Sequence, residues 1–179
     1  MAMKKLMSFI KLGQKNSPRV FPEITLTIVK RVYGGKNFAS PSPDITETVH
    51  DSNGNVVGQI LYTISPLKDR IYLFEIEVDP LYRRRGFGLA SLVSLAKTHD
   101  LPMTVVHPIS PALLFWETAQ KELSDKVAMT QSLSISEMDK EKTRWNHFQP
   151  EIDKLEKAIA ERFVRGEPYE QAVGRGFEE

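Results

Sequence analysis

The residues best suited to chemistry lie between positions 78 and 90. Gly86 and Gly88 lack a Cβ atom, so a phosphate group can approach the backbone closely at these positions. If a helix begins here, its free N–H groups and the positive end of its dipole point at the same place. Three arginines just before Gly86 add charge-assisted hydrogen bonds, which favour a multiply charged ligand such as a pyrophosphate. The segment therefore predicts an anion site, with a solvated basic turn as the alternative; it reads Val78-Asp79-Pro80-Leu81-Tyr82-Arg83-Arg84-Arg85-Gly86-Phe87-Gly88-Leu89-Ala90.

The elements around this segment are predicted to hold it between a strand and a helix. Residues 71–78 read as a strand that stops at an Asp-Pro pair, and the apolar residues from Leu89 onward have helical spacing. Residues 101–107 are again typical of a strand, and residues 111–123 of a second helix. The middle of the chain therefore predicts the order strand, loop, helix, strand, helix.

Three strands are predicted before this region. Residues 24–33 suit a first strand, and an Asn53-Gly54 turn is expected to join residues 45–50 and 56–65 as an antiparallel hairpin. Together with residues 71–78, these strands form an antiparallel meander.

The C-terminal part predicts a hairpin and a helix. Residues 127–135 and 143–148 flank a polar stretch and are interpreted as a last antiparallel hairpin. Residues 151–163 are predicted to be helical, with Gly166 and Pro168 ending the helix. Its apolar stripe either packs on the chain itself, which is the more common use, or contacts a partner chain or a second copy; the stripe consists of Ile152, Leu155, Ile159 and Phe163.

Two motifs resemble those of the GNAT acetyltransferase family. Residues 83–88, R-R-R-G-F-G, are similar to the family's Q/R-x-x-G-x-G/A motif, and residues 111–117, P-A-L-L-F-W-E, resemble its A-x-x-F-Y-E motif. The resemblance implies an α/β (α+β) fold, with a mixed, mostly antiparallel sheet flanked by helices. We expect a lead-in at residues 1–22, a GNAT-like domain at 23–149 and a C-terminal helical extension at 150–179.

The resemblance also implies acetyl-CoA as cosubstrate. The coenzyme is expected in a cleft where the fourth and fifth strands splay apart, with the thioester against the backbone of Val78. The residues expected to bind it are Val78, Arg83, Arg84, Arg85, Gly86, Phe87, Gly88, Leu89, Ala90, Ser110, Phe115 and Trp116.

The implied reaction is direct attack of a primary amine on the thioester. Glu75 and Glu77 share a strand face by period two, so either could remove the proton of the amine, and Glu75 is favoured. The alternative is that both only line a polar face. Many family members carry a tyrosine that protonates the leaving thiolate, but this chain has Trp116, whose indole is too weak an acid. Tyr82, Ser110 or solvent is expected to substitute.

The connection from residue 34 to residue 44 is too short for the two helices that usually cover the acceptor site, so an open cleft and a macromolecular acceptor are expected. One rival function is a catalytically inactive GNAT-fold protein that serves in binding or assembly. A second rival is acyl-CoA-dependent modification of a nucleic-acid base.

Composition excludes several kinds of site. The 179 residues include no cysteine, which removes disulfides and thiolate chemistry, and the four histidines lack metal-ligand spacing, so no metal is expected. A net charge of +1 does not support nucleic-acid binding. The apolar run at the N-terminus is too short to span a membrane, and a cytoplasmic protein is expected.

Overall fold

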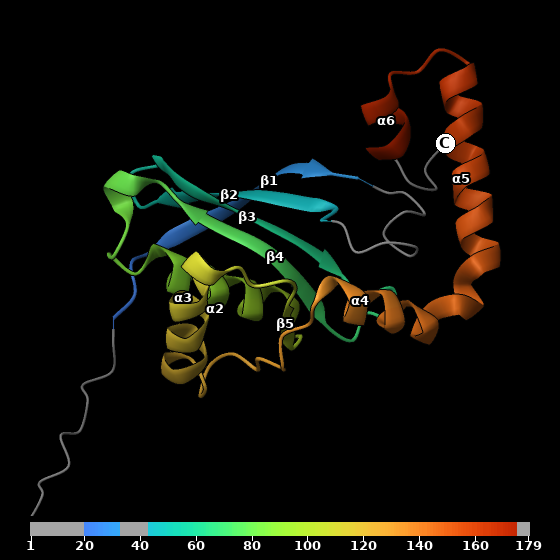
Figure 1. Cartoon of the computed structure of the whole chain (residues 1–179). Helices are drawn as coiled ribbons and strands as arrows, with labels where there is room; N and C mark the ends of the chain where they lie inside the picture. The colour runs from blue at the N-terminus through green and yellow to red at the C-terminus, as the bar shows by residue number, and fades with distance from the viewer. Residues whose placement is uncertain (1–19, 33–42, 175–179) are drawn as a thin grey trace, which may run out of the picture.

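The computed structural model describes residues 20–32 and 43–174. The expected lead-in up to residue 19 and most of the connection between the first two strands lie outside these residues, as does the tail from residue 175. The described part forms one mixed sheet with helices packed on it (Figure 1).

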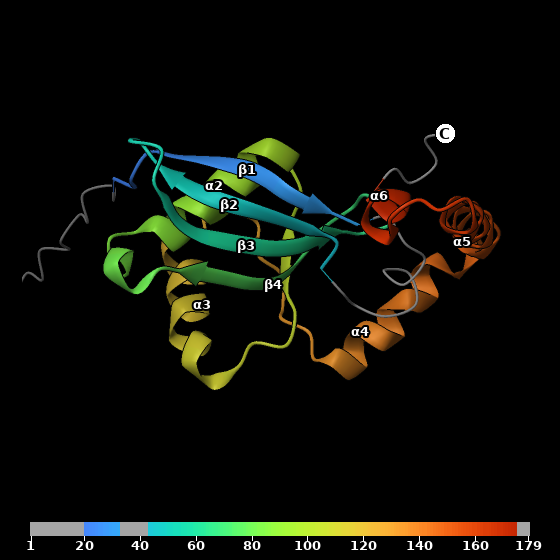
Figure 2. The same ribbon diagram turned by 90° about the horizontal axis from the view of Figure 1, so that it is seen from above.

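The sheet has five strands in the order β1-β2-β3-β4-β5, which is also their order in the sequence. Figure 2 shows β1 to β4 side by side in this order. The pairs from β1 to β4 are antiparallel, whereas β4 and β5 are parallel. The predicted meander is confirmed; the strands are β1 (Ile24–Arg31), β2 (Ile45–Asp51), β3 (Val56–Ile64), β4 (Ile71–Val78) and β5 (Met103–Val105). At the hairpin between β2 and β3, Gly54 takes a φ of 82° that a residue with a Cβ adopts only with strain.

Helices α2 (Phe87–His99) and α3 (Ser110–Glu122) lie together on one side of the sheet (Figure 1). Leu92 and Leu95 of α2 are fully buried against Ile60 and Leu73 of the sheet. Each such leucine contributes about 1.5–3 kcal/mol relative to an exposed one. This core fixes the start of α2 relative to the end of β4.

An irregularity in β4 changes which of its residues face the core. Tyr62 of β3 pairs with Leu73, but Leu61 pairs with Glu75, so Phe74 is the extra residue of a bulge. Leu73 and Ile76 consequently both pack against the α2 side of the sheet, three positions apart instead of two. The bulge leaves the side chain of Glu75 exposed.

Strands β4 and β5 remain together only at one end. Their pairing covers Ile71–Leu73 and Met103–Val105, and a last hydrogen bond runs from the Val106 N–H to the Leu73 carbonyl oxygen (2.8 Å). Beyond it, the edge of β4 from Phe74 onward has no β5 residue beside it. The expected splay is therefore present.

The predicted hairpin of residues 127–135 and 143–148 is wrong. Residues 127–134 pass beside β5 with only two isolated bridges, and the next residues form helix α4 (Ile135–Glu141) and the 3₁₀ segment η2 (Lys142–Phe148). The reason is local, because Ser134 caps α4. Its hydroxyl accepts a hydrogen bond from the Glu137 N–H (3.3 Å), and the Glu137 carboxylate accepts one from the Ser134 N–H (2.7 Å).

The predicted C-terminal helix is present as α5 (Gln149–Val164), followed by α6 (Tyr169–Gly174), and both lie at one end of the sheet (Figure 2). Leu155 and Ile159 pack against Ala172 and Val173 of α6. Ile152 is also buried, but Phe163 is 58% exposed. Most of the apolar stripe is thus used within the chain.

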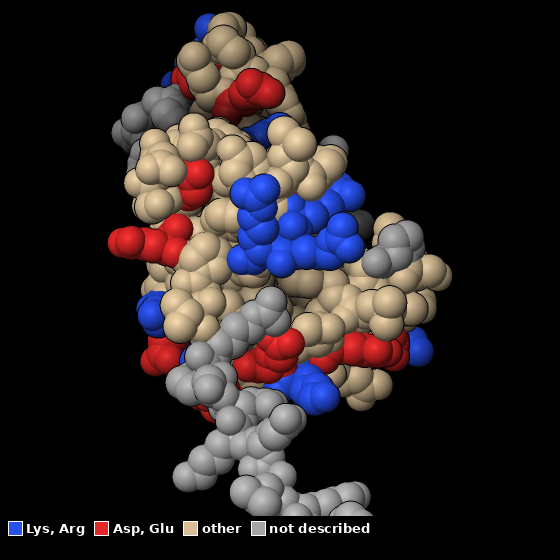
Figure 3. All heavy atoms as spheres, turned by 90° about the vertical axis from the view of Figure 1, so that its left-hand side faces the viewer, with Lys and Arg blue, Asp and Glu red and all other residues tan. Residues whose placement is uncertain are grey.

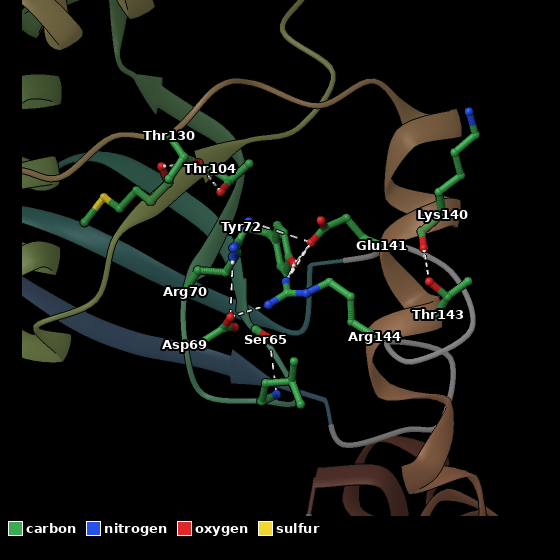
Figure 4. Close-up of polar contacts among 12 residues, drawn as sticks. Ser65, Asp69, Arg70, Tyr72, Thr104, Thr130, Lys140, Glu141, Thr143 and Arg144 are labelled. Carbon is green, nitrogen blue, oxygen red and sulfur yellow. Dashed lines mark hydrogen bonds and ion pairs between the residues drawn. The ribbon is translucent and has the colours of Figure 1, made fainter.

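A polar cluster attaches the C-terminal segment to the sheet (Figure 4). Arg144 donates to Glu141 (2.9 Å) and to Asp69, which lies in the turn before β4. The hydroxyl of Tyr72 in β4 also donates to Glu141. Next to this cluster, Tyr72 packs against Trp145 in an apolar group, so α4 and η2 cover the start of β4.

Within the described ranges, no helix has the length and apolarity that a bilayer crossing requires. The same residues contain no group of three or more histidine and carboxylate side chains arranged to hold a metal ion.

Candidate functional site

A cavity of about 1260 Å³ opens where β4 and β5 splay apart. Such a volume accommodates a ligand larger than most drug-sized molecules. The cavity is bounded by the second half of β4, the loop and first turn of α2, the segment after β5, α3, and the start of α4. Its lining residues are Phe74, Glu75, Ile76, Glu77, Val78, Tyr82, Arg83, Arg84, Gly86, Phe87, Gly88, Leu89, Val106, His107, Pro108, Ile109, Ala112, Phe115, Trp116, Thr118 and Ile135.

The turn into α2 presents backbone donors to this cavity. Gly86 is the N-cap of α2 with a φ of 92°, a conformation that glycine adopts without strain. Its carbonyl oxygen accepts the hydrogen bond from the Ala90 N–H (2.9 Å), so Ala90 is already used within the helix. The N–H groups of Phe87, Gly88 and Leu89 precede this first helical bond and point out of the helix end. They form the geometry of an anion cradle.

The second glycine of the turn lies against an aromatic wall. A Cβ atom at Gly88 would come within 2.9 Å of Cε2 of Phe115, so only glycine lets the ring pack this closely. Phe115 and Trp116 of α3 contact each other edge to face, with ring centroids 4.9 Å apart. The cradle is therefore flanked by an apolar wall whose two rings are inclined at 68° to each other, and the cavity lies beside it.

The three arginines before Gly86 have different roles. Arg83 donates from Nε to the Val78 carbonyl oxygen (2.9 Å), which ties the loop to the end of β4. Arg85 places its guanidinium over the ring of Tyr82, 5.6 Å from the centroid, and does not line the cavity. Arg84 has a φ of 61° and lines the cavity. All three lie in the loop between β4 and α2, and Figure 3 shows a patch of Lys and Arg side chains on the face of the molecule where this loop lies.

The two candidate bases are both exposed residues of β4 that line the cavity. Glu77 accepts a hydrogen bond from Nε2 of Gln59 on β3 (3.0 Å). Within the described part of the chain, the Glu75 carboxylate has no hydrogen bond or ion pair. Of the two carboxylates, Glu75 is therefore the one that can accept a hydrogen bond from a ligand without giving up an existing one.

The titratable groups with clearly shifted pKa values lie elsewhere. Burial raises the pKa of Glu47 on β2, although a hydrogen bond from the Tyr62 hydroxyl (3.2 Å) opposes the shift. Burial also lowers the pKa of His99, whose Nε2 lies 3.2 Å from the same hydroxyl. None of these three residues lines the cavity, so this cluster belongs to the core beneath the sheet.

The structure brings together most of the residues that the sequence singled out. Glu75, Glu77, Val78, Arg83, Arg84, Phe115, Trp116 and the four residues 86–89 line one cavity, whereas Arg85, Ala90 and Ser110 do not. Their binding roles stay predictions. Sequence reasoning missed His107 and Ile135 as cavity residues. Neither belongs to a motif, and each reaches the cavity only through the tertiary placement of the end of β5 and the start of α4.

One comparison with known proteins gives a family match. Residues 25–98 match the model of the acetyltransferase (GNAT) family, a range that covers the strands β1 to β4 and nearly all of α2. A search among curated proteins found no significant match.

Two solved structures are similar to the chain. One is a crystal structure from Deinococcus radiodurans R1 of a protein proposed to be an acetyltransferase: it shares 14% identity, with 56% of this chain and 83% of that chain covered and a TM-score of 0.38. The other is nourseothricin acetyltransferase, with 17% identity, 57% and 74% coverage and a TM-score of 0.34. The mixed sheet, the splay and the matched segment together identify this chain as carrying the GNAT acetyltransferase fold, with residues 25–98 as the part that matches the GNAT family.

Proposed function

We propose that the protein is an acyl-CoA-dependent N-acetyltransferase that transfers acetyl from acetyl-CoA to a primary amine. The observation that carries the proposal is the glycine turn at the start of α2, whose free N–H groups open into the same cavity as the unpaired edge of β4. An extended ligand with a diphosphate at one end and a reactive group at the other fits that combination. The GNAT family match supports acetyl-CoA as this ligand.

Binding of acetyl-CoA would begin at the cradle. The N–H groups of Phe87, Gly88 and Leu89 would hold the pyrophosphate, and Arg84 would add a charge-assisted hydrogen bond. The rings of Phe115 and Trp116 would cover the pantetheine arm and keep water from it. The thioester would then lie along the edge of β4 beyond Phe74, where no β5 residue competes for the backbone.

Catalysis would consist of positioning the amine and moving its proton. An amine that enters at the exposed face of β4 meets Glu75, whose carboxylate takes the proton so that the nitrogen can attack the thioester carbonyl. No covalent enzyme intermediate is needed. Glu77 already accepts a hydrogen bond from Gln59, so it is better suited to orienting an ammonium group than to taking its proton.

One observation favours a second candidate, a GNAT-fold protein that binds a ligand or partner without catalysis. Trp116 lines the cavity at the position where many family members have a tyrosine, and an indole N–H does not protonate a thiolate. This candidate keeps the fold and predicts either no acetyl-CoA binding or binding without turnover.

Calorimetric titration with acetyl-CoA tests the binding step. Replacing Arg84 by Ala should weaken binding about 10-fold or more, since a charge-assisted hydrogen bond contributes roughly 1.5–3 kcal/mol. Arg85→Ala is the matched control, because Arg85 comes from the same loop but does not line the cavity. Equal losses in both variants would indicate only a general effect of charge, and no binding to the native protein would refute the proposal.

Turnover is tested by following the acetylated product with three amines, a lysine-containing peptide, spermidine and glycinamide. Glu75→Gln should lower kcat about 10²-fold or more while acetyl-CoA affinity stays constant, because only the proton acceptor is lost. An unchanged kcat in this variant would remove Glu75 from the mechanism. Binding without any product would favour the second candidate.

A further inference from the structure

His107 has a backbone conformation that its sequence position disfavours. Its φ is 50°, in the left-handed region, and Pro108 follows it. A residue with a Cβ is strained at such a φ, and a following proline pushes the residue toward extended conformations. Glycine would fit this turn at lower cost.

The surrounding backbone enforces this conformation. The preceding residue, Val106, donates the last hydrogen bond between β5 and β4, and the His107 N–H donates to the Leu133 carbonyl oxygen (2.6 Å). His107 is thus fixed on both sides, immediately after the point where β5 leaves β4. Strain that is imposed in this way is concentrated at functional sites.

His107 is an exposed residue and is one of those that line the cavity. It follows directly on the residue that closes the splay, so its backbone lies at the closed end of the splay, near the point where Phe74 begins the unpaired edge of β4. The proposed base, Glu75, lines the same cavity, and the proposed function places the reacting thioester along this edge of β4. Among side chains, imidazole exchanges protons most readily near neutral pH. The indole of Trp116, which also lines the cavity, is too weak an acid to do so.

We propose that His107 is the proton donor to the coenzyme A thiolate. The inference rests on the proposed acetyltransferase function. As the amine nitrogen forms its bond to the acetyl carbonyl carbon, the carbon–sulfur bond breaks, and the imidazolium of His107 gives its proton to the sulfur. Glu75 takes one proton of the ammonium group and passes it to solvent. The second nitrogen proton is lost to solvent as the amide forms, and solvent returns one proton to His107, so the overall products from an ammonium substrate are amide, thiol and one released proton.

Other charged groups face the same space and enter the pH dependence. They are Glu75 and Glu77 from β4 and Arg83 and Arg84 from the following loop, with Tyr82 as a further titratable group. The described residues that α3 and α4 contribute to the cavity wall do not titrate. With protonated His107 as the donor, kcat falls at the alkaline side of its pH profile.

The test is His107→Gly with added imidazole. Glycine suits the positive φ, so this variant should fold at least as stably as the native protein, and it leaves space for a free imidazole in place of the lost ring. We expect acetyl-CoA affinity within about two-fold of native, a loss of kcat on the order of 10²-fold, and partial recovery of kcat with imidazole. The acetylated amine is the product to measure, because imidazole also accepts acetyl groups itself.

Two further variants separate a chemical role from a structural one. His107→Asn keeps a polar side chain that tolerates positive φ but cannot transfer a proton, so it should lose kcat without recovery and lack the alkaline decrease. His147→Asn, at an exposed histidine outside the cavity, should behave as native.

Each outcome decides the inference. Native kcat in His107→Gly, a loss that imidazole does not restore, or an effect confined to KM would overturn the role of His107 and leave the proposed function intact. Absence of product from the native protein would overturn both, and this is seen before any variant is made.

Discussion

At the scale of single residues, the site depends on positions where a Cβ atom has no room. Gly58 of β3 is the clearest case, because a Cβ there would overlap the carbonyl oxygen of Glu77 and come within 3.2 Å of Cα of Val78. The backbone of β4 therefore approaches β3 more closely than any other residue permits. This approach sets the position of Glu77 and Val78, and with them the start of the loop to α2.

Gly58→Ala should destabilise the protein by about 1–3 kcal/mol, because the clash is with backbone atoms that cannot rotate away. Denaturant unfolding measures this change. The matched control is Gly174→Ala, whose new Cβ would make an ordinary contact of 3.7 Å with the Arg31 carbonyl oxygen and should change stability little. A neutral effect at Gly58 would mean that β3 and β4 separate without cost.

At the scale of elements, α4 is a short helix that needs its cap. It has seven residues, too few to form a stable helix alone, and it supplies Ile135 to the cavity wall. The capping box at Ser134 was readable in the sequence as Ser-x-x-Glu, a pattern that indicates a helix start rather than a strand. The sequence interpretation gave more weight to the β-like residues around it and missed the helix.

Ser134→Ala should lower the free energy of unfolding by about 1 kcal/mol, the usual cost of a lost N-cap. Ser132→Ala, at an exposed serine two residues earlier, is the control and should have almost no effect. Circular dichroism during urea unfolding compares the two variants. If both behave alike, the cap at Ser134 does not hold α4.

At the scale of the whole molecule, one cluster ties the C-terminal segment to the sheet. Arg144 connects Asp69, before β4, to Glu141 at the end of α4 (Figure 4). Burial alone would raise the pKa of Asp69, but hydrogen bonds from Ser65 and Arg144 outweigh it and hold the pKa below the ordinary value. Because the pKa of the folded state is the lowered one, this stabilisation is complete above pH 3.8 and is lost as the pH falls through the folded value.

Arg144→Met should loosen the attachment of α4 and η2 to the start of β4, because Asp69 and Glu141 then share only the longer ion pairs with Arg70 (3.8 Å each). Hydrogen exchange should become faster in residues 135–148 at pH 7, while the amides of β2 and β3 keep their protection. The difference from native should disappear in acid, where Asp69 is protonated in both proteins. Lys142→Met is the control, since its pair with Asp139 (3.8 Å) is exposed and contributes little. Uniformly faster exchange would contradict a local anchor.

The sequence by itself determined the elements that carry their own local signals. Alternating apolar residues, the Asn53-Gly54 turn and the run from Arg83 to Gly88 predicted the meander and the glycine turn, because strand period, turn chemistry and helix starts depend on neighbouring residues. Only the tertiary structure decided which side chains share the cavity. His107 and Ile135 reach it because β5 separates from β4 after Val105 and because α4 packs back against β4. Such contacts join residues far apart in the sequence, so they produce no periodic pattern in it.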